Sequence, residues 1–141
     1  MILPDVNLLV YAYNGASQQH LAARQWLETT MSGDEPVGLP WAVLHAFLRL
    51  TTSSRVMPVP LTTRQAVDVI EEWRTVVLIT EPGPGYWSSF RELIIGAHVR
   101  GDLVSDAHLA ALAIEHDATL YTADTDFRRF RGLRVINPLL E

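Results

Sequence analysis

Three aspartates stand at positions where neighbouring segments of the chain could bring their carboxylates together. Asp5 follows the short apolar start of the chain, Asp124 follows the apolar segment 118–122, and Asp106 opens an alanine- and leucine-rich segment. Carboxylates fixed about 5 Å apart repel each other by roughly 3 kcal/mol per pair at an effective dielectric constant near 20. Such a cluster requires raised pKa values or a bound cation. Oxygen ligands favour a hard divalent ion, so we predict a site for Mg²⁺ or Mn²⁺.

A divalent ion in such a site could polarise a phosphoryl oxygen and activate a water molecule for in-line attack on a phosphodiester. Asp126, two residues after Asp124, is an additional candidate ligand. Each acid also has an ordinary structural explanation, because aspartate caps helices, occupies turns and complements the positive end of a helix dipole. The predicted metal site therefore depends on the acids meeting at one place.

Arginines lie close to the late acids in the sequence. Arg128, Arg129 and Arg131 come just after Asp126, and Arg49 lies near the end of an apolar segment. Solvated arginines that balance an acidic surface are the commoner explanation of such a strip. Guanidinium groups also bind phosphates through paired hydrogen bonds, so contacts with a nucleic-acid backbone are the functional alternative.

Composition excludes several other kinds of site. The chain of 141 residues contains no cysteine, which rules out disulfide frameworks, thiolate zinc sites and cysteine nucleophiles. Its 11 basic residues are all arginine, which rules out lysine Schiff-base and P-loop chemistry. The net charge of −5 is not that of a protein that wraps duplex DNA. The histidines show no zinc-site spacing; we expect His45 to be a hydrogen-bonded core residue and His108 to lie on a helix surface.

Short apolar segments alternate with longer helical patterns along the chain. Strands are predicted over 1–4, 37–39, 76–79, 118–122 and 133–136, and helices over 18–31, 40–50, 62–73, 86–99 and 106–116. This alternation predicts an α/β fold, a three-layer α/β/α sandwich around a mainly parallel sheet of four to five short strands. Ligands bind at the carboxyl ends of such strands, where Asp5 and Asp124 stand.

Length and composition predict a single domain over residues 1–141, since 48% of the residues are apolar and one core can be buried. No apolar run reaches the length of a membrane span, and the first residues lack the pattern of a signal peptide. We therefore expect a cytoplasmic protein without a membrane partner.

Three segments, in this order, resemble PIN-domain ribonucleases and in particular the VapC toxins of type II toxin–antitoxin systems. They are residues 1–7 (MILPDVN), 40–49 (PWAVLHAFLR) and 106–127, the last with DAHLAALA and TADTDF at its two ends. The resemblance extends over essentially the whole chain. It implies a Mg²⁺- or Mn²⁺-dependent endoribonuclease in which Asp5, Asp106 and Asp124 are catalytic metal ligands. Asp126 lies where an additional acid often occurs, and Asn7 and Thr122 match polar positions that orient the site.

The resemblance also implies partners. They are an RNA substrate, contacted by Arg49, Arg128 and Arg129, a second copy of the chain in a homodimer, and a cognate VapB-type antitoxin that blocks the site. DNA would be bound only through that antitoxin.

One position departs from the family pattern, because many relatives carry a glutamate where this chain has Ala46. Three interpretations of the function stay open. The leading one is a toxin that cleaves RNA with a metal-activated water. The second is a PIN-fold binding module with weak or no catalysis. The third is a phosphohydrolase with Asp5 as nucleophile, although such enzymes usually carry a second aspartate where this chain has Asn7.

Overall fold

The computed structural model describes residues 1–140. Its strands are β1 (Ile2–Pro4), β2 (Gly38–Pro40), β3 (Leu78–Thr80), β4 (Thr119–Tyr121) and β5 (Val135–Ile136). Its α-helices are α1 (Val6–Tyr13), α2 (His20–Met31), α3 (Trp41–Thr51), α4 (Thr63–Trp73), α5 (Tyr86–Gly96) and α6 (Leu103–Glu115). A 3₁₀ helix, η1 (Thr125–Arg129), follows β4.

The sheet is parallel throughout. β4 pairs with β1 on one side and with β5 on the other, and β2 pairs with β3. A parallel bridge between Ile2 and Val37 connects these two groups of strands. Pro4 lies opposite Tyr121, and the Asp5 backbone N–H donates to the Tyr121 carbonyl oxygen at 2.8 Å. The residues that follow β1 and β4 therefore start from the same edge of the sheet, as the sequence predicts.

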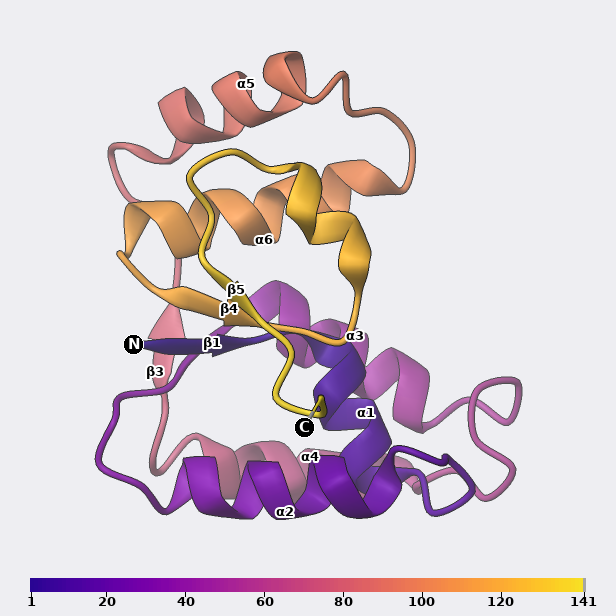
Figure 1. Cartoon of the computed structure of the whole chain (residues 1–141). Helices are drawn as coiled ribbons and strands as arrows, with labels where there is room; N and C mark the ends of the chain where they lie inside the picture. Colours follow the sequence, from indigo (N-terminus) through magenta and orange to yellow (C-terminus); the bar gives the residue numbers. More distant parts are fainter. Residues whose placement is uncertain (141) are drawn as a thin grey trace.

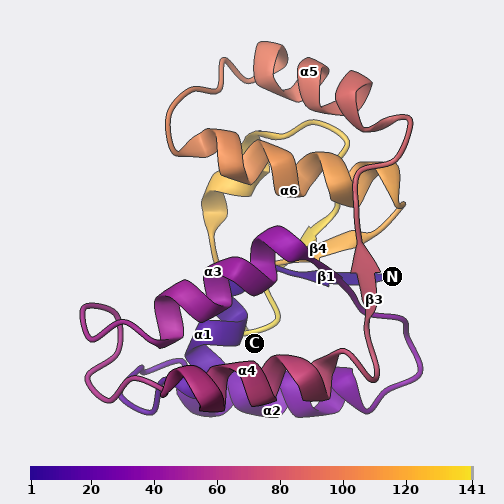
Figure 2. The same cartoon turned by 180° about the vertical axis from the view of Figure 1, so that it is seen from behind.

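Helices cover both faces of this sheet. α5 and α6 lie over one face, while α1, α2 and α4 lie on the other (Figure 1). Seen from behind, α3 runs close to the strands and packs on α1 and α4 (Figure 2). The predicted three-layer α/β/α arrangement is confirmed. Its core includes the fully buried side chains of Leu3, Leu39, Phe47, Leu112 and Leu120.

Local sequence signals explain where several helices begin. The Asp5 side chain accepts the Val6 backbone N–H and caps α1. Thr62 and Gln65 form a reciprocal capping box at the start of α4, with hydrogen bonds of 3.1 and 2.9 Å. Pro40 stands directly before α3, where its fixed φ and missing N–H cost the helix nothing. These helix starts fix the directions in which the strand ends continue.

Three predicted elements differ from the structure. The segment 76–79 was expected to be a buried strand, but β3 begins at Leu78, and Val76 and Leu78 are 57% and 58% exposed. β3 pairs only with β2 and is therefore an edge strand. α5 ends at Gly96 and not at residue 99, because His98 adopts a left-handed conformation with φ of 51°. α6 begins at Leu103, so Asp106 lies in its first turn and does not open it.

None of the helices described within residues 1–140 is long and apolar enough to cross a membrane. The expectation of a single domain over residues 1–141 stays a prediction.

Candidate metal centre and its cleft

Three carboxylates converge at the carboxyl edge of β1 and β4. Asp106, Asp124 and Asp126 each offer an oxygen atom, and these atoms lie within 4.8 Å of one another. Asp106 comes from the first turn of α6, while Asp124 and Asp126 come from the segment that follows β4. Asp124 Oδ1 accepts the Asp126 backbone N–H at 2.8 Å, which caps η1 and fixes the spacing of the two acids. Asp126, predicted only as an additional ligand, thus belongs to the same cluster as Asp106 and Asp124.

Asp5 lies beside this cluster with both carboxylate oxygens engaged. Oδ1 accepts the Val6 backbone N–H at 2.7 Å, and Oδ2 accepts the Thr122 hydroxyl at 2.7 Å. Asp5 is outside the group that falls within 4.8 Å, but its charge contributes to raising the pKa of Asp106. Asp5 therefore caps α1 and also borders the centre; its role as a metal ligand stays a prediction.

Thr122 connects the parts of the centre through one buried hydroxyl. The side chain is only 1% exposed. Its oxygen donates to Asp5 and accepts the Asp124 backbone N–H at 3.0 Å and the Asn7 side-chain amide at 3.2 Å. A hydroxyl has one donor and two acceptor positions, so its hydrogen-bonding capacity is filled. Thr122 thus contacts Asp5 and Asp124 directly, and Asn7 contacts Thr122; the orienting roles predicted for these two residues stay predictions.

Burial and neighbouring negative charges raise the pKa values of Asp5 and Asp106. Burial is the largest cause that raises the pKa of Asp106 to about 6, and the charges of Asp5, Asp124 and Asp126 add to it. Arg129 acts in the opposite direction. Burial also raises the pKa of Asp5, against the hydrogen bonds from Thr122 and Val6, with a further contribution from the charge of Asp124. A hard divalent cation fits this donor set, because it would offset the repulsion between carboxylates that are otherwise costly to ionise together.

A cleft of about 480 Å³ opens directly beside the acids, between α3, α5 and α6. Asp5 and Asp106 border one part of it. Apolar and aromatic side chains make up most of the remainder, namely Val6, Ala42, Val43, Ala46, Tyr86, Phe90, Val104 and Leu109, together with Arg49, Ser105 and His108. Ala46 leaves the α3 wall of the cleft without a carboxylate.

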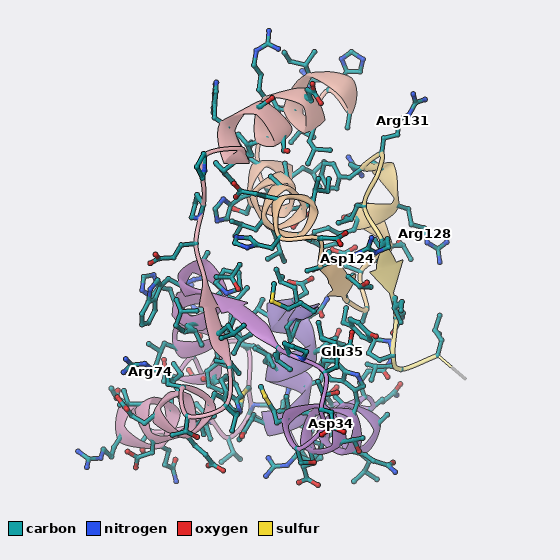
Figure 3. The ribbon with its side chains drawn as sticks, turned by 90° about the vertical axis from the view of Figure 1, so that its left-hand side faces the viewer. Asp34, Glu35, Arg74, Asp124, Arg128 and Arg131 are labelled. Atoms are coloured by element: carbon teal, nitrogen blue, oxygen red, sulfur yellow. The ribbon has the colours of Figure 1, made fainter. Side chains whose placement is uncertain are left out.

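The predicted arginines take different places around the centre. Arg49 is exposed and lines the cleft. Arg129 contacts Asp126 at 3.5 Å and donates to its backbone carbonyl at 2.9 Å, so it partly balances the acids. Arg128 borders a small hollow together with Asp124, and its side chain extends outward beside that residue (Figure 3). Arg131 points away from the acids.

Two aromatic residues and one histidine at the cleft were not predicted as site residues. The Tyr86 hydroxyl and His108 Nδ1 are hydrogen-bonded at 2.6 Å, and the Tyr86 and Phe90 rings stack with centroids 5.4 Å apart. The surface position expected for His108 is wrong, because α5 packs over α6 and half-buries the ring, which lowers its pKa. The core position expected for His45 is also wrong, since this side chain is exposed beside Trp41. The i, i+4 spacing of Tyr86 and Phe90 was the available sequence signal.

Comparisons with known proteins bear on the family and the fold of the chain. Residues 2–133 match the PIN domain family. The chain is 39% identical over 144 aligned residues to Ribonuclease VapC33 of Mycobacterium tuberculosis, with 100% of both chains covered. Its fold is similar to a chain of the Rickettsia felis VapBC2 complex bound to a promoter DNA fragment, with TM-score 0.73 and 20% identity over 97% of this chain and 98% of that one. A similar fold occurs in M. tuberculosis VapC20, described as a sarcin–ricin-loop-cleaving toxin, with TM-score 0.68 and 20% identity over 95% and 99% of the two chains.

Proposed function

The chain belongs to the PIN-domain family, and we propose that it is a Mg²⁺- or Mn²⁺-dependent endoribonuclease, the toxin of a type II toxin–antitoxin system. The observation that carries this proposal is the convergence of Asp106, Asp124 and Asp126, with Asp5 beside them, at the carboxyl edge of a parallel sheet. The full-length similarity to a protein named as a ribonuclease supports the same activity.

The proposed roles follow from the contacts of each residue. Asp5, Asp106 and Asp124 would hold the ion, and Asp126 would add a fourth carboxylate. A bound divalent ion supplies polarisation of the phosphoryl oxygen and lowers the pKa of the attacking water. Thr122 fixes the Asp5 carboxylate by its hydrogen bond, and Asn7 holds the hydroxyl of Thr122 in place.

RNA would reach the acids along the cleft and the arginine-rich segment after β4. Arg49 lines the cleft, and Arg128 borders a hollow together with Asp124, so both lie next to acids of the centre. We propose that these side chains and Arg129 contact phosphates on either side of the cleavage position. Single-stranded or looped RNA fits best, because its backbone can adopt an in-line geometry at the scissile phosphate.

The first test is cleavage of total RNA with Mg²⁺, with Mn²⁺ and with a chelator. Asp106→Asn should lower the rate by more than about 100-fold, since even the outer partners of metal ligands are worth 10- to 100-fold. Asp5→Asn should also abolish cleavage if Asp5 is a ligand. Asp34→Asn is the matched control: Asp34 is exposed and lies far from Asp124 (Figure 3), so this variant should cleave at the unmodified rate.

Two outcomes would contradict the proposal. Cleavage that continues undiminished in chelator, or in the Asp106→Asn variant, would contradict a metal-dependent reaction at these acids. RNA binding without any cleavage in saturating Mn²⁺ would instead favour a binding module, which is the interpretation that Ala46 first raised.

We further propose that the chain forms a homodimer and is inhibited by a VapB-type antitoxin. Large apolar side chains that remain exposed on α5 and β3 support a protein partner: Trp87 is 65% exposed, Ile95 56% and Leu78 58%. The resemblance of the fold to a chain of a VapBC complex points to the same class of partner. Light scattering of the purified chain should give twice the monomer mass, and a monomer across micromolar concentrations would contradict the homodimer.

A further inference from the structure

The cleft beside the acids has two chemically different walls. Tyr86 and Phe90 of α5 form an aromatic wall, while Ala42 and Ala46 of α3 line the same cleft with small side chains. Because Ala42 and Ala46 carry only methyl groups, these two positions of α3 leave the cleft open. The cleft therefore combines an aromatic surface with room beside it.

The aromatic wall is held in place by contacts with neighbouring side chains and by the loop that precedes it. The Tyr86 hydroxyl is fixed by His108 at 2.6 Å, and the ring stacks on Phe90 with an interplanar angle of 16°. The loop that precedes Tyr86 is held by Glu115, whose carboxylate accepts the backbone N–H groups of Gly83 and Gly85 at 2.8 and 2.9 Å. A ring positioned in this way can bind a flat ligand without first losing its own rotational freedom.

We propose that this cleft binds a nucleobase of the RNA substrate, stacked against the Tyr86–Phe90 pair, in the nucleotide next to the scissile phosphate. This inference rests on the proposed nuclease function and names the part of the substrate that its cleft recognises. Continuity with the acids supports it, because Asp5 and Asp106 line the same cleft as Tyr86. A base seated there would place its own phosphate near the acid centre.

The chemistry of the cleft favours a base over an apolar peptide segment. Its volume of about 480 Å³ falls within the range of small-ligand pockets. Its polar groups are Ser105, His108 and Arg49 in addition to the two acids, which suits a flat heterocycle joined to a phosphate. Stacking on aromatic side chains is how proteins bind the unpaired bases of single-stranded RNA.

The test compares two fluorescent probes by anisotropy in Ca²⁺, with a gel to verify that the RNA stays intact. One probe is a mixed-sequence pool of single-stranded RNA, about 12 nucleotides long, and the other is a base-free abasic backbone of the same length. Tyr86→Ala should weaken binding of the RNA by about 5- to 150-fold, the range for loss of base stacking. It should leave binding of the abasic backbone within about two-fold, because phosphate contacts do not involve the ring.

Three further variants separate stacking from other effects. Tyr86→Phe keeps the ring and loses the hydrogen bond to His108, and we expect its RNA affinity to stay within about two-fold. Tyr86→Leu keeps an apolar side chain without a ring and should behave like Tyr86→Ala, which guards against a folding defect in the smaller variant. Leu21→Ala is the control for loss of an exposed apolar side chain, since Leu21 is 81% exposed on α2 and does not line the cleft. It should bind both probes as the unmodified chain does.

Each outcome decides the inference. Unchanged RNA binding by Tyr86→Ala and Tyr86→Leu, or equal losses for the two probes, would overturn the base-binding cleft while leaving the proposed nuclease intact. Equal affinity of the unmodified chain for RNA and for the abasic backbone would do the same. Failure of the unmodified chain to bind either probe would overturn the proposed function and this inference with it.

Discussion

The Thr122 hydroxyl is hydrogen-bonded to three residues of the acid centre. It donates to Asp5 and accepts from Asp124 and Asn7 at a site that is almost fully buried. Asp5 precedes α1, while Asp124 precedes η1, so this hydroxyl joins two segments that are more than a hundred residues apart in sequence. These contacts support the prediction that Thr122 is a positioning residue that acts through Asp5.

Replacing Thr122 with valine keeps the volume and removes the hydroxyl. The Asp5 carboxylate, the Asp124 N–H and the Asn7 amide then each lose a partner, and the free energy of unfolding should fall by about 1–3 kcal/mol. The pKa of Asp5 should rise further, because the Thr122 hydrogen bond lowers it. RNA cleavage should fall by about 10- to 100-fold. Urea denaturation and a cleavage assay measure both effects, and Thr122→Ser, which keeps the hydroxyl, should restore most of each.

The residues of the centre differ in how far the sequence could predict them. Asp106 and Asp124 followed from their places next to a predicted helix and strand, and Asp126 from its spacing to Asp124. The Tyr86–His108 contact could not be predicted, because it depends on how α5 packs over α6, and no local pattern encodes that contact. The same packing is why His108 is half-buried and not a surface residue.

Among the elements, α5 carries the aromatic wall of the cleft, and its position depends on Glu115 at the end of α6. The Glu115 side chain is only 13% exposed and accepts two backbone N–H groups of the loop before α5. A Cβ atom at Gly83 would lie 2.6 Å from Glu115 Oε2, so a larger residue there would require the carboxylate of Glu115 to shift. α5 is therefore attached to α6 at a defined point.

Glu115→Gln should loosen this attachment, because the amide offers a single acceptor oxygen and turns an NH₂ group toward the second N–H. We expect the free energy of unfolding to fall by about 1–3 kcal/mol and RNA affinity to fall with it. Mn²⁺ affinity measured by calorimetry should not change, since the acid cluster does not touch Glu115. Glu71→Gln is the control: Glu71 contacts Arg74 at 3.6 Å on an exposed surface, and such pairs are worth about 0–1 kcal/mol. A change in Mn²⁺ binding by Glu115→Gln would contradict this separation of roles.

The sequence predicted the existence and order of the elements better than their ends. The alternation of apolar strands and helical patterns was enough for the parallel three-layer fold. The exposure of β3 was not predictable, because the apolar, β-branched segment 76–79 is typical of a buried strand and only the pairing order places Leu78 at an edge. α5 ends early because His98 adopts a left-handed conformation, and a histidine does not by itself predict such a turn.

For the whole molecule, the acid centre couples metal binding and pH to the stability of the fold. Its carboxylates come from β1–α1, α6 and the segment after β4, so they are near one another only when the chain is folded. The pKa of Asp106 is about 6 in the folded chain, above the ordinary value of 3.8. Between pH of about 4 and 6, the folded state thus binds more protons at this site than the unfolded state. Asp106 therefore lowers stability as pH rises through that window, and the loss remains at higher pH.

Asp106→Asn removes the loss of folding stability caused by the ionised Asp106 carboxylate, and it also removes a proposed metal ligand. Its effect on stability should therefore have opposite signs in chelator and in Mn²⁺. In chelator at pH 7.5 the variant should be more stable than the unmodified chain by on the order of 1 kcal/mol, after allowing for solvent screening of a partly exposed group. At a pH of about 3 most of the difference should vanish, because this pH lies below both the ordinary pKa of 3.8 and the folded value of about 6, so Asp106 is largely neutral in both states of the unmodified chain. Mn²⁺ at 100 times its dissociation constant should stabilise the unmodified chain by about 2.7 kcal/mol and the variant by much less. Urea denaturation at the two pH values, with and without Mn²⁺, measures all three differences, and Asp34→Asn should follow the unmodified chain throughout. A variant that is less stable in chelator at pH 7.5 would mean that Asp106 is not under electrostatic strain, and the physical reason for a cation at this edge of the sheet would be lost.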